Sequence, residues 1–231
     1  MNTTLMEKSP KDLVPLFFEK TAETYDTVVK WTTLGNDKYW KEQIIKKIPP
    51  CSSILDLACG TGILTFQICK KFPHAKIIGV DITKSYLREA RKKLNPHHKI
   101  SLLNQDAEKL ILKDKFDCIT SSYISKYCEA EVLLKTCLDH LKPGGKIILH
   151  DFTYPQNRLV RAAWGFYFFL LRFSGYFLTS WKEVFVELPK LIRSTNWSYE
   201  YELTLKKYGF KVERESLSIG TSTILTGNHI V

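Results

Sequence analysis

The sequence has no CxxC pair, no internal repeat, no low-complexity segment and no apolar leader at its start, and each absence argues against a class of protein. Its six cysteines are scattered between positions 51 and 137, which predicts reduced thiols rather than a zinc site or a disulfide framework. The first twelve residues, MNTTLMEKSPKD, are polar and lack the apolar core of a secretory signal. We therefore expect a cytoplasmic protein without a structural metal.

The chain has fewer acidic residues than basic ones, and its formal net charge is +10. The densest cationic group consists of Arg88, Arg91, Lys92 and Lys93, in the predicted helix 85–94. A charged run on a helix is usually a solvated face, although an anionic membrane surface or a nucleic acid would also attract it. Charge alone therefore does not identify a partner.

Strands alternate with helices through most of the chain, whose 231 residues fit one α/β domain. The predicted strands are 51–58, 75–81, 99–106, 116–123 and 146–151, and the predicted helices are 62–72, 85–94, 130–141 and 197–209. This alternation indicates a parallel sheet with helices on both faces. The last two strand-like segments, 210–219 and 221–230, are joined at Gly220 and predict an antiparallel hairpin.

Two segments lie outside this pattern. Residues 1–50 carry no strand signal and end at Pro49-Pro50, so we expect an N-terminal helical lid beside a domain formed by residues 51–231. We also expect a helical substrate insertion at about residues 155–196, between the fifth strand and the last helix.

Within the insertion, residues 159–179 are rich in aromatic side chains. The longest uncharged run there, between Arg161 and Arg172, is shorter than the roughly 20 apolar residues of a membrane span. Three interpretations stay open: a buried helix pair, an apolar channel for a lipid-like substrate, or a face that rests on a membrane.

Residues 54–65, ILDLACGTGILT, place a glycine-rich bend directly after the first predicted strand. Gly60 and Gly62 let the backbone turn and let a ligand approach without a Cβ in between. A dinucleotide fingerprint would need a third glycine where the chain has Thr65, which weakens that interpretation. A Walker A loop is excluded, because no Gly-Lys-Ser/Thr follows.

Acidic residues end the next two predicted strands. Asp81 closes IIGVD, where a carboxylate can accept both hydroxyls of a ribose. Asp106 follows the third strand in LLNQDAEKL, where it can accept from an adenine amino group. Because ligands bind at the carboxyl ends of parallel strands, the glycines and these two acids predict a slot for an adenosine without a phosphate cradle.

The series DLACGTG, VD, QDAEKL, FDCITSS and LKPGGKIIL resembles the motifs of class I S-adenosylmethionine (SAM)-dependent methyltransferases, over roughly residues 50–231. That resemblance implies a Rossmann-like, seven-stranded, mostly parallel sheet whose last strand inserts antiparallel, in agreement with the predicted hairpin. It departs from the pattern at Ala58, where glycine is usual. SAM would be the methyl donor and S-adenosyl-L-homocysteine the product.

The start of the chain is similar to the C-methyltransferases of ubiquinone and menaquinone biosynthesis. Residues 25–40, YDTVVKWTTLGNDKYW, resemble that family's N-terminal signature, with departures at Val28, Val29 and Asp37. The likeness implies a SAM-dependent C-methylation of a lipophilic quinone precursor.

Residues 142–153, KPGGKIILHDFT, resemble the family's second signature, with Asp151 in place of glutamate and Thr153 in place of serine. After the fourth strand the family has Phe-Gly-Leu-Arg-Asn, and this chain has residues 123–127, where the basic residue survives as Lys126. These departures bear on the substrate rather than on the cofactor.

The resemblance also implies which residues hold SAM. The contacts that it implies directly are Thr61, Asp81, Asp106, Ala107 and Ser122. The complete set of candidate cofactor residues adds Tyr25, Asp56, Ala58, Gly60, Gly62 and Ile82.

Methyl transfer from a sulfonium is an in-line displacement, so the protein positions two reactants and supplies a base where one is needed. Removing a phenolic proton activates a hydroquinone ring carbon, and Lys126 is the candidate cation for the phenolate. His150 and Asp151 are candidates for taking the proton or orienting the ring, and Tyr127 is a candidate hydrogen-bond partner of the substrate. The alternatives are a solvated surface lysine at Lys126 and a core histidine at His150.

Other functions remain open at this point. An O- or N-methyltransferase of another small aromatic or lipid-like molecule would use the same slot. An RNA or protein methyltransferase would suit the charge, but the Asn/Asp-Pro-Pro-Tyr-type clamp for adenine is replaced by SSYI. A SAM-binding protein without activity would lack an acceptor site. We expect a small lipophilic substrate and no nucleic acid, and we allow peripheral membrane contact and a homodimer.

Overall fold

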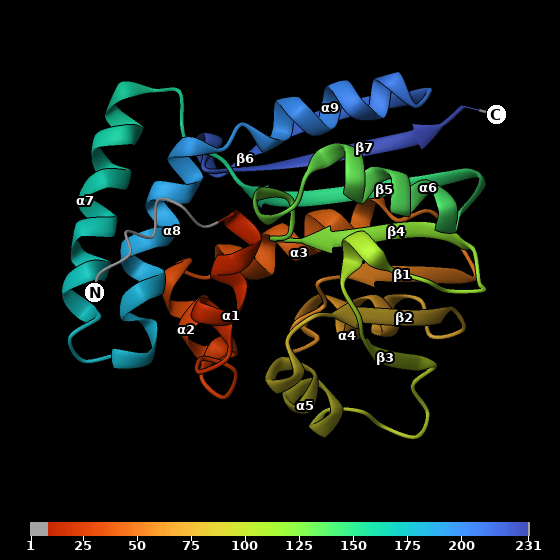
Figure 1. The fold of residues 1–231 in the computed structure, drawn as a ribbon, viewed down its shortest axis with the longest axis horizontal. Helices are drawn as coiled ribbons and strands as arrows, with labels where there is room; N and C mark the ends of the chain where they lie inside the picture. Colours follow the sequence, from red (N-terminus) through yellow and green to blue (C-terminus); the bar gives the residue numbers. More distant parts are fainter. Residues whose placement is uncertain (1–8, 231) are drawn as a thin grey trace.

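Seven strands form one twisted sheet in the order β3-β2-β1-β4-β5-β7-β6 (Figure 1). The structure is a computed structural model that describes residues 9–230. The strands are β1 (Ser53–Leu57), β2 (Lys76–Asp81), β3 (Ile100–Asn104), β4 (Phe116–Ser122), β5 (Leu141–Phe152), β6 (Phe210–Leu217) and β7 (Ser222–His229). β7 runs antiparallel to both of its neighbours, and the remaining pairs are parallel. The predicted fold class, including the closing hairpin, is confirmed.

Helices cover both faces of the sheet and extend past one of its ends (Figure 1). They are α1 (Leu13–Phe18), α2 (Tyr25–Thr32), α3 (Asn36–Lys47), α4 (Ile63–Lys71), α5 (Lys84–Lys92), α6 (Ala130–His140), α7 (Arg158–Ser174), α8 (Lys182–Ser194) and α9 (Trp197–Lys207). Among residues 9–230, no helix combines the length and the apolar character needed to cross a membrane.

The start of β5 differs most from the prediction, which placed it at residue 146. Leu141 pairs with Phe116 and Lys146 pairs with Cys118, so the KPGG turn is a bulge inside the strand. Glycine and proline favour a turn, and the two flanking pairs keep this turn attached to β4.

The central strands contribute alternate side chains to two hydrophobic cores, because neighbouring residues of a strand point to opposite faces of the sheet. Leu55 and Leu57 pack with residues of α6 and α9 on one face. Ile54 packs with residues of α3 and α4 on the other face. The sheet is therefore buried on both sides, and its carboxyl-end edge is left for a ligand.

A third core lies beyond the carboxyl ends of the strands, where α1 and α2 meet α8 (Figure 1). Phe17 of α1 and Val29 of α2 belong to it together with Trp181 and Phe185. The N-terminal helices and the insertion are thus packed against each other over the same edge of the sheet.

Candidate active site

The site lies at the carboxyl ends of β1 and β4, where the strand order reverses. After β1 ends at Leu57, the backbone is left-handed at Ala58, Gly60 and Gly62, with φ of +53°, +58° and +84°. Glycine adopts this conformation freely, whereas the same conformation costs an alanine about 1–2 kcal/mol. The departure at Ala58 is therefore accommodated as local strain in the loop.

Gly62 makes a testable contribution to this loop. A Cβ at Gly62 would lie 2.5 Å from Cε2 of Phe66, whereas a Cβ at Gly209 (φ +79°) would meet nothing within 4 Å. Gly209→Ala should therefore cost about 1–2 kcal/mol of unfolding free energy through backbone strain alone, and Gly62→Ala should cost more. Denaturant unfolding of both variants measures the difference, and equal losses would show that Phe66 yields freely.

Asp81 fixes the loop and still has acceptor capacity for a ligand. Its carboxylate accepts from Gly60 N at 2.8 Å and from Thr83 N at 2.7 Å. A carboxylate offers about four acceptor positions, so two remain for a pair of ribose hydroxyls. Burial raises the pKa of Asp81 above its ordinary value.

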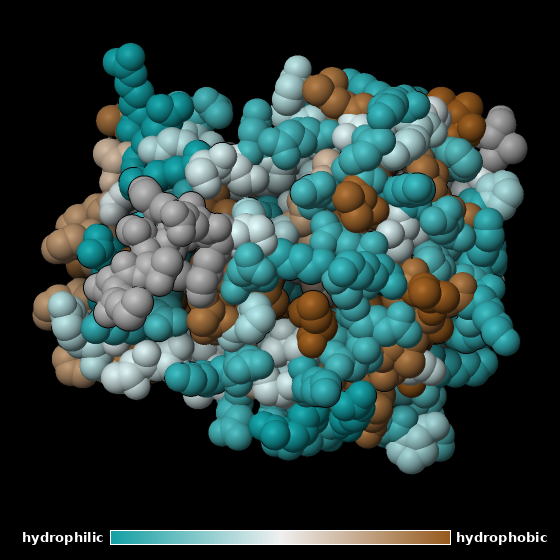
Figure 2. All heavy atoms as spheres, viewed as in Figure 1, coloured by the Kyte–Doolittle hydropathy of each residue, from teal (hydrophilic) through white to brown (hydrophobic). Residues whose placement is uncertain are grey.

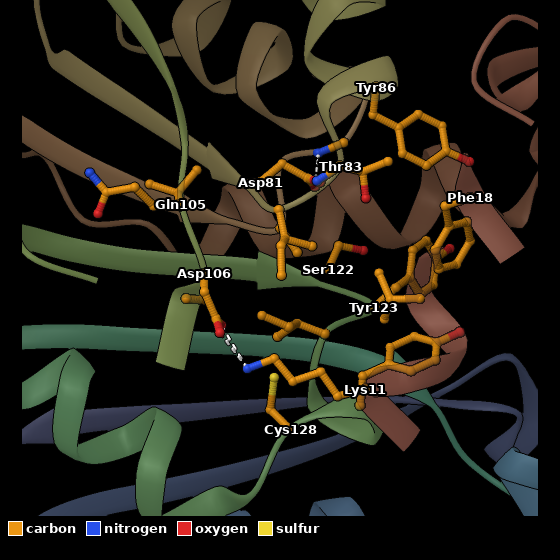
Figure 3. Close-up of a pocket in the computed structure, with 18 of the residues that line it drawn as sticks. Lys11, Phe18, Asp81, Thr83, Tyr86, Gln105, Asp106, Ser122, Tyr123 and Cys128 are labelled. Atoms are coloured by element: carbon orange, nitrogen blue, oxygen red, sulfur yellow. Dashed lines mark hydrogen bonds and ion pairs between the residues drawn. The ribbon is translucent and has the colours of Figure 1, made fainter. Parts of the chain in front are cut away.

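Asp81 and Asp106 line the same cavity (Figure 3). Asp106 is paired with Lys11, which was not predicted from the sequence. Lys11 Nζ lies 2.6 Å from Asp106 Oδ2 and also pairs with Glu108. The N-terminal segment therefore crosses the end of the slot where an adenine amino group was expected.

A recess next to this cavity is lined by Asp56, Thr61 and Lys41. Thr61 Oγ1 donates to Asp26 Oδ1 at 2.5 Å, and Thr61 O accepts from Lys93 at 2.9 Å. Ten of the eleven candidate cofactor residues line the cavity or the recess; Gly62, the exception, is the N-cap of α4.

Asp56 predicts a pH dependence of stability. It is buried in β1, accepts from Thr65 Oγ1 at 2.6 Å, and burial raises its pKa to about 6. An unfolded aspartate titrates near pH ~4. Between about pH 4 and pH 6 the folded chain therefore binds more protons at this group than the unfolded chain does. As the pH rises through that window, this group lowers the free energy of unfolding. Relative to the Asp56→Asn variant, the wild type should lose on the order of 3 kcal/mol of unfolding free energy over this pH window. Urea unfolding at several pH values measures this; a constant difference would contradict the assignment.

Tyr123 lines both the cavity and the recess, and it is not among the residues predicted from the sequence. It follows β4 with φ of +79°, a rare conformation for a bulky residue that is often found at functional sites. Its hydroxyl donates to Asp37 Oδ1 at 2.7 Å, and Asp37 also pairs with the buried Lys41. Asp37, one of the departures from the family signature, therefore orients Tyr123.

An apolar cavity of about 350 Å³ adjoins the first one. Its walls come from α2, α7, α8 and the residues after β4. Four aromatic residues line both cavities and form the wall between them: Phe18, Tyr25, Tyr123 and Tyr127. Burial raises the pKa of the Tyr25, Tyr123 and Tyr127 hydroxyls well above the ordinary value, so the wall is uncharged.

Lys126 lines the apolar cavity and is paired with Asp151 behind it. Its Nζ donates to Asp151 Oδ1 at 2.7 Å and to the carbonyl of Tyr123 at 3.0 Å, which leaves one of three N–H donors for a ligand. The Nζ also lies 4.5 Å from the centre of the Tyr127 ring. Burial lowers the pKa of Lys126. With a side chain only 1% exposed, Lys126 is not a solvated surface lysine.

His150 is fully buried and lines none of the three cavities described above. Its Nδ1 lies 3.0 Å from Ser122 Oγ and its Nε2 lies 2.6 Å from Ser222 Oγ. Burial holds the pKa of His150 well below its ordinary value. Both ring nitrogens are thus engaged by serine hydroxyls, and the ring supports Ser122, which lines the same cavity as Asp81.

The residues present fit SAM. Asp81 has free acceptor positions at the end of β2, and Gly60 leaves space where a side chain would stand. No glycine-lysine phosphate cradle follows β1, which suits a ligand without phosphates. When bound, SAM supplies a methyl group on a cationic sulfur, and the uncharged aromatic wall is a surface that such a cation prefers.

The sheet order and an adenosine slot at its reversal point define a SAM-dependent methyltransferase of class I. The chain belongs to the ubiE/COQ5 methyltransferase family, whose sequence pattern matches residues 5–229. It is 29% identical to the demethylmenaquinone methyltransferase of Lactobacillus johnsonii, over 97% of this chain and 96% of that protein. It is 28% identical to a ubiquinone/menaquinone biosynthesis C-methyltransferase of Syntrophotalea carbinolica, over 94% of each chain.

Solved structures agree on the fold. A chain of a complex between the Haloferax volcanii Trm112 methyltransferase activator and a methyltransferase superposes with a TM-score of 0.66 at 16% identity, covering 91% of this chain and 96% of that one. The magnesium protoporphyrin IX methyltransferase of Synechocystis, solved with bound S-adenosyl-L-homocysteine, gives 0.53 at 18% identity, covering 91% and 84%.

Proposed function

We propose that the protein transfers the methyl group of SAM to a ring carbon of a lipophilic quinone precursor, of the ubiquinone or menaquinone type. The observation that carries this proposal is the apolar cavity, which shares an aromatic wall with the cofactor cavity. A ring in the apolar cavity would meet a methyl donor at that wall, and a prenyl tail would fill the remaining apolar space. The two quinone-biosynthesis methyltransferases that the chain resembles support the same substrate class.

In this proposal Asp81 holds the ribose, Asp106 and Ala107 face the adenine, and the loop at 58–62 approaches the methionine half of SAM. Asp106 binds the adenine amino group only when Lys11 shares or releases it, because the two side chains are already paired. Thr61 and Asp56 belong to the recess at the methionine end.

Lys126 is the catalytic cation in this proposal. Its free N–H would hold the oxygen of a hydroquinone whose phenolic proton has left to water, and the resulting phenolate would raise the electron density on the ring carbon that accepts the methyl group. As the bond from the ring carbon to the methyl group forms, the bond from sulfur to the methyl group breaks and S-adenosyl-L-homocysteine leaves. The methylated ring carbon then loses its own proton to water. Tyr127 lines both cavities and is placed to contact the ring. Asp151 lines neither cavity, so we assign it the positioning of Lys126; we assign His150 the support of Ser122 rather than the proton transfer.

The N-terminal helices and the insertion at about 155–196 would act together as the cover of the substrate, since α1, α2 and α8 share one core. A lipophilic substrate also favours peripheral contact with a membrane by an otherwise cytoplasmic protein. The homodimer that the sequence allows is not tested by any contact in the structure.

The proposal is tested by incubating the protein with methyl-labelled SAM and cell extract, followed by partition between organic solvent and water. Label should enter the organic layer with the wild type and not with Asp81→Ala. Label that precipitates with RNA or protein instead would contradict a lipophilic acceptor. Label in a small water-soluble aromatic would favour an O- or N-methyltransferase.

A further inference from the structure

Within residues 9–230, helix α7 exposes an apolar face that no other element covers. Of its seventeen residues, Trp164 alone is buried. Leu159 is 81% exposed, Phe166 64% and Phe173 63%, and Phe177 just beyond the helix is 81% exposed. Their spacing puts them on one side of the helix, and Figure 2 shows apolar side chains along the left edge of the molecule, where α7 lies in Figure 1. An exposed apolar stripe of this size is typical of a contact surface.

The charged residues of the segment that contains this face have one sign. Between Asp151 and Glu183 the chain contains no acidic residue and four cationic ones: Arg158, Arg161, Arg172 and Lys182. Arg158, Arg172 and Lys182 are exposed. Such a surface attracts an anionic partner, whereas a second copy docked by the same face would bring these cations together.

The opposite side of α7 lines the apolar cavity, with Trp164, Tyr167 and Leu171 among its residues. Where this cavity meets solvent, Leu34 and Ile219 line it and are 77% and 79% exposed. Both have left-handed backbones, with φ of +51° and +58°. For a β-branched residue such as Ile219 this conformation is rare and strained, and it holds an apolar side chain in the open at the mouth of the cavity.

We propose that the outer face of α7, with the turn that follows it, docks on an anionic lipid surface beside the mouth of the cavity. The aromatic side chains enter the boundary between headgroups and acyl chains, and the arginines pair with lipid phosphates. A substrate tail can then pass from the bilayer into the cavity along Leu34 and Ile219. The passage of the tail rests on the proposed function, and the docking does not.

Flotation with vesicles tests the docking. The wild type should float with vesicles of phosphatidylglycerol and phosphatidylcholine in equal parts, and less with phosphatidylcholine alone or at high salt. Phe166→Ser/Phe173→Ser should lower the bound fraction at least about tenfold, and Arg158→Gln/Arg172→Gln should reduce the preference for the anionic vesicles. Ile111→Ser is the matched control, because Ile111 is 83% exposed in the loop before β4.

Three results would overturn the docking. The first is a wild type that does not float, and the second is a double phenylalanine variant that floats as well as Ile111→Ser. The third is a wild type that sediments as a dimer while the double phenylalanine variant sediments as a monomer. Turnover separates this proposal from the proposed function. The double phenylalanine variant should methylate a short-tailed, water-soluble ring like the wild type, and should lose turnover only on a long-tailed ring embedded in vesicles. If the wild type binds vesicles but methylates neither ring, the proposed function fails and the docking stands.

Discussion

Asp81→Ala should lose SAM binding, with an affinity at least about 100-fold lower by titration calorimetry. Each hydrogen bond to a charged acceptor contributes about 1.5–3 kcal/mol, and two ribose hydroxyls would be released together. The substitution also frees Gly60 N and Thr83 N, which the carboxylate now accepts from, so the glycine loop loses its anchor. Both effects lower the affinity for SAM.

Two control variants make this result specific. Asp81→Asn keeps one acceptor oxygen and should bind SAM with an intermediate affinity. Asp114→Ala removes an exposed carboxylate whose one ion pair within residues 9–230 is with Lys76, and this variant should bind SAM normally. Normal affinity in Asp81→Ala would show that the cofactor lies elsewhere.

Lys126→Met should keep SAM binding and lose methyl transfer by about 10²–10³-fold, the usual effect of removing one donor that stabilises a developing anion. Methionine has a similar length and no charge, so the shape of the apolar cavity is largely kept. The change leaves Asp151 buried without its partner, a situation that often costs 3–5 kcal/mol of stability. The measurement is therefore the rate of label transfer at saturating SAM, together with the unfolding midpoint.

The double variant Lys126→Met/Asp151→Asn separates catalysis from folding. It removes both charges at once, which is far less costly than removing one. We expect it to unfold near the wild-type midpoint, to bind SAM and to remain inactive. Substantial turnover in this variant would contradict the role of Lys126. Lys126→Arg keeps the cation and should retain turnover better than Lys126→Met.

The sheet could be predicted from the sequence because its signals are local. Alternating apolar residues and the glycines after the first strand identify each βαβ unit without knowledge of distant contacts. The strand ends then place Gly60, Asp81 and Asp106 at one edge by the geometry of parallel sheets alone. The start of β5 was predicted less well, because its KPGG bulge depends on pairing with Phe116 of another strand.

The site was predicted less completely because its remaining parts depend on contacts between distant segments. Lys11 reaches Asp106, and Tyr123 reaches Asp37. Neither contact has a local signal, although the place of Tyr123 directly after the fourth strand could have identified it. Residues 159–179 allowed three interpretations because one helix has two apolar faces: α7 lines the cavity with one and exposes the other, so it is not part of a buried pair.

The most direct test of the central claim is the chemical position of the transferred methyl group. The purified protein would be given SAM with a ¹³C-labelled methyl group and a short-tailed hydroquinone that has one unsubstituted ring carbon. The product would then be read by ¹³C NMR. Our account predicts an aryl methyl signal on that carbon, absent with Lys126→Met/Asp151→Asn. A methoxy signal, or no product although SAM binds, would contradict it.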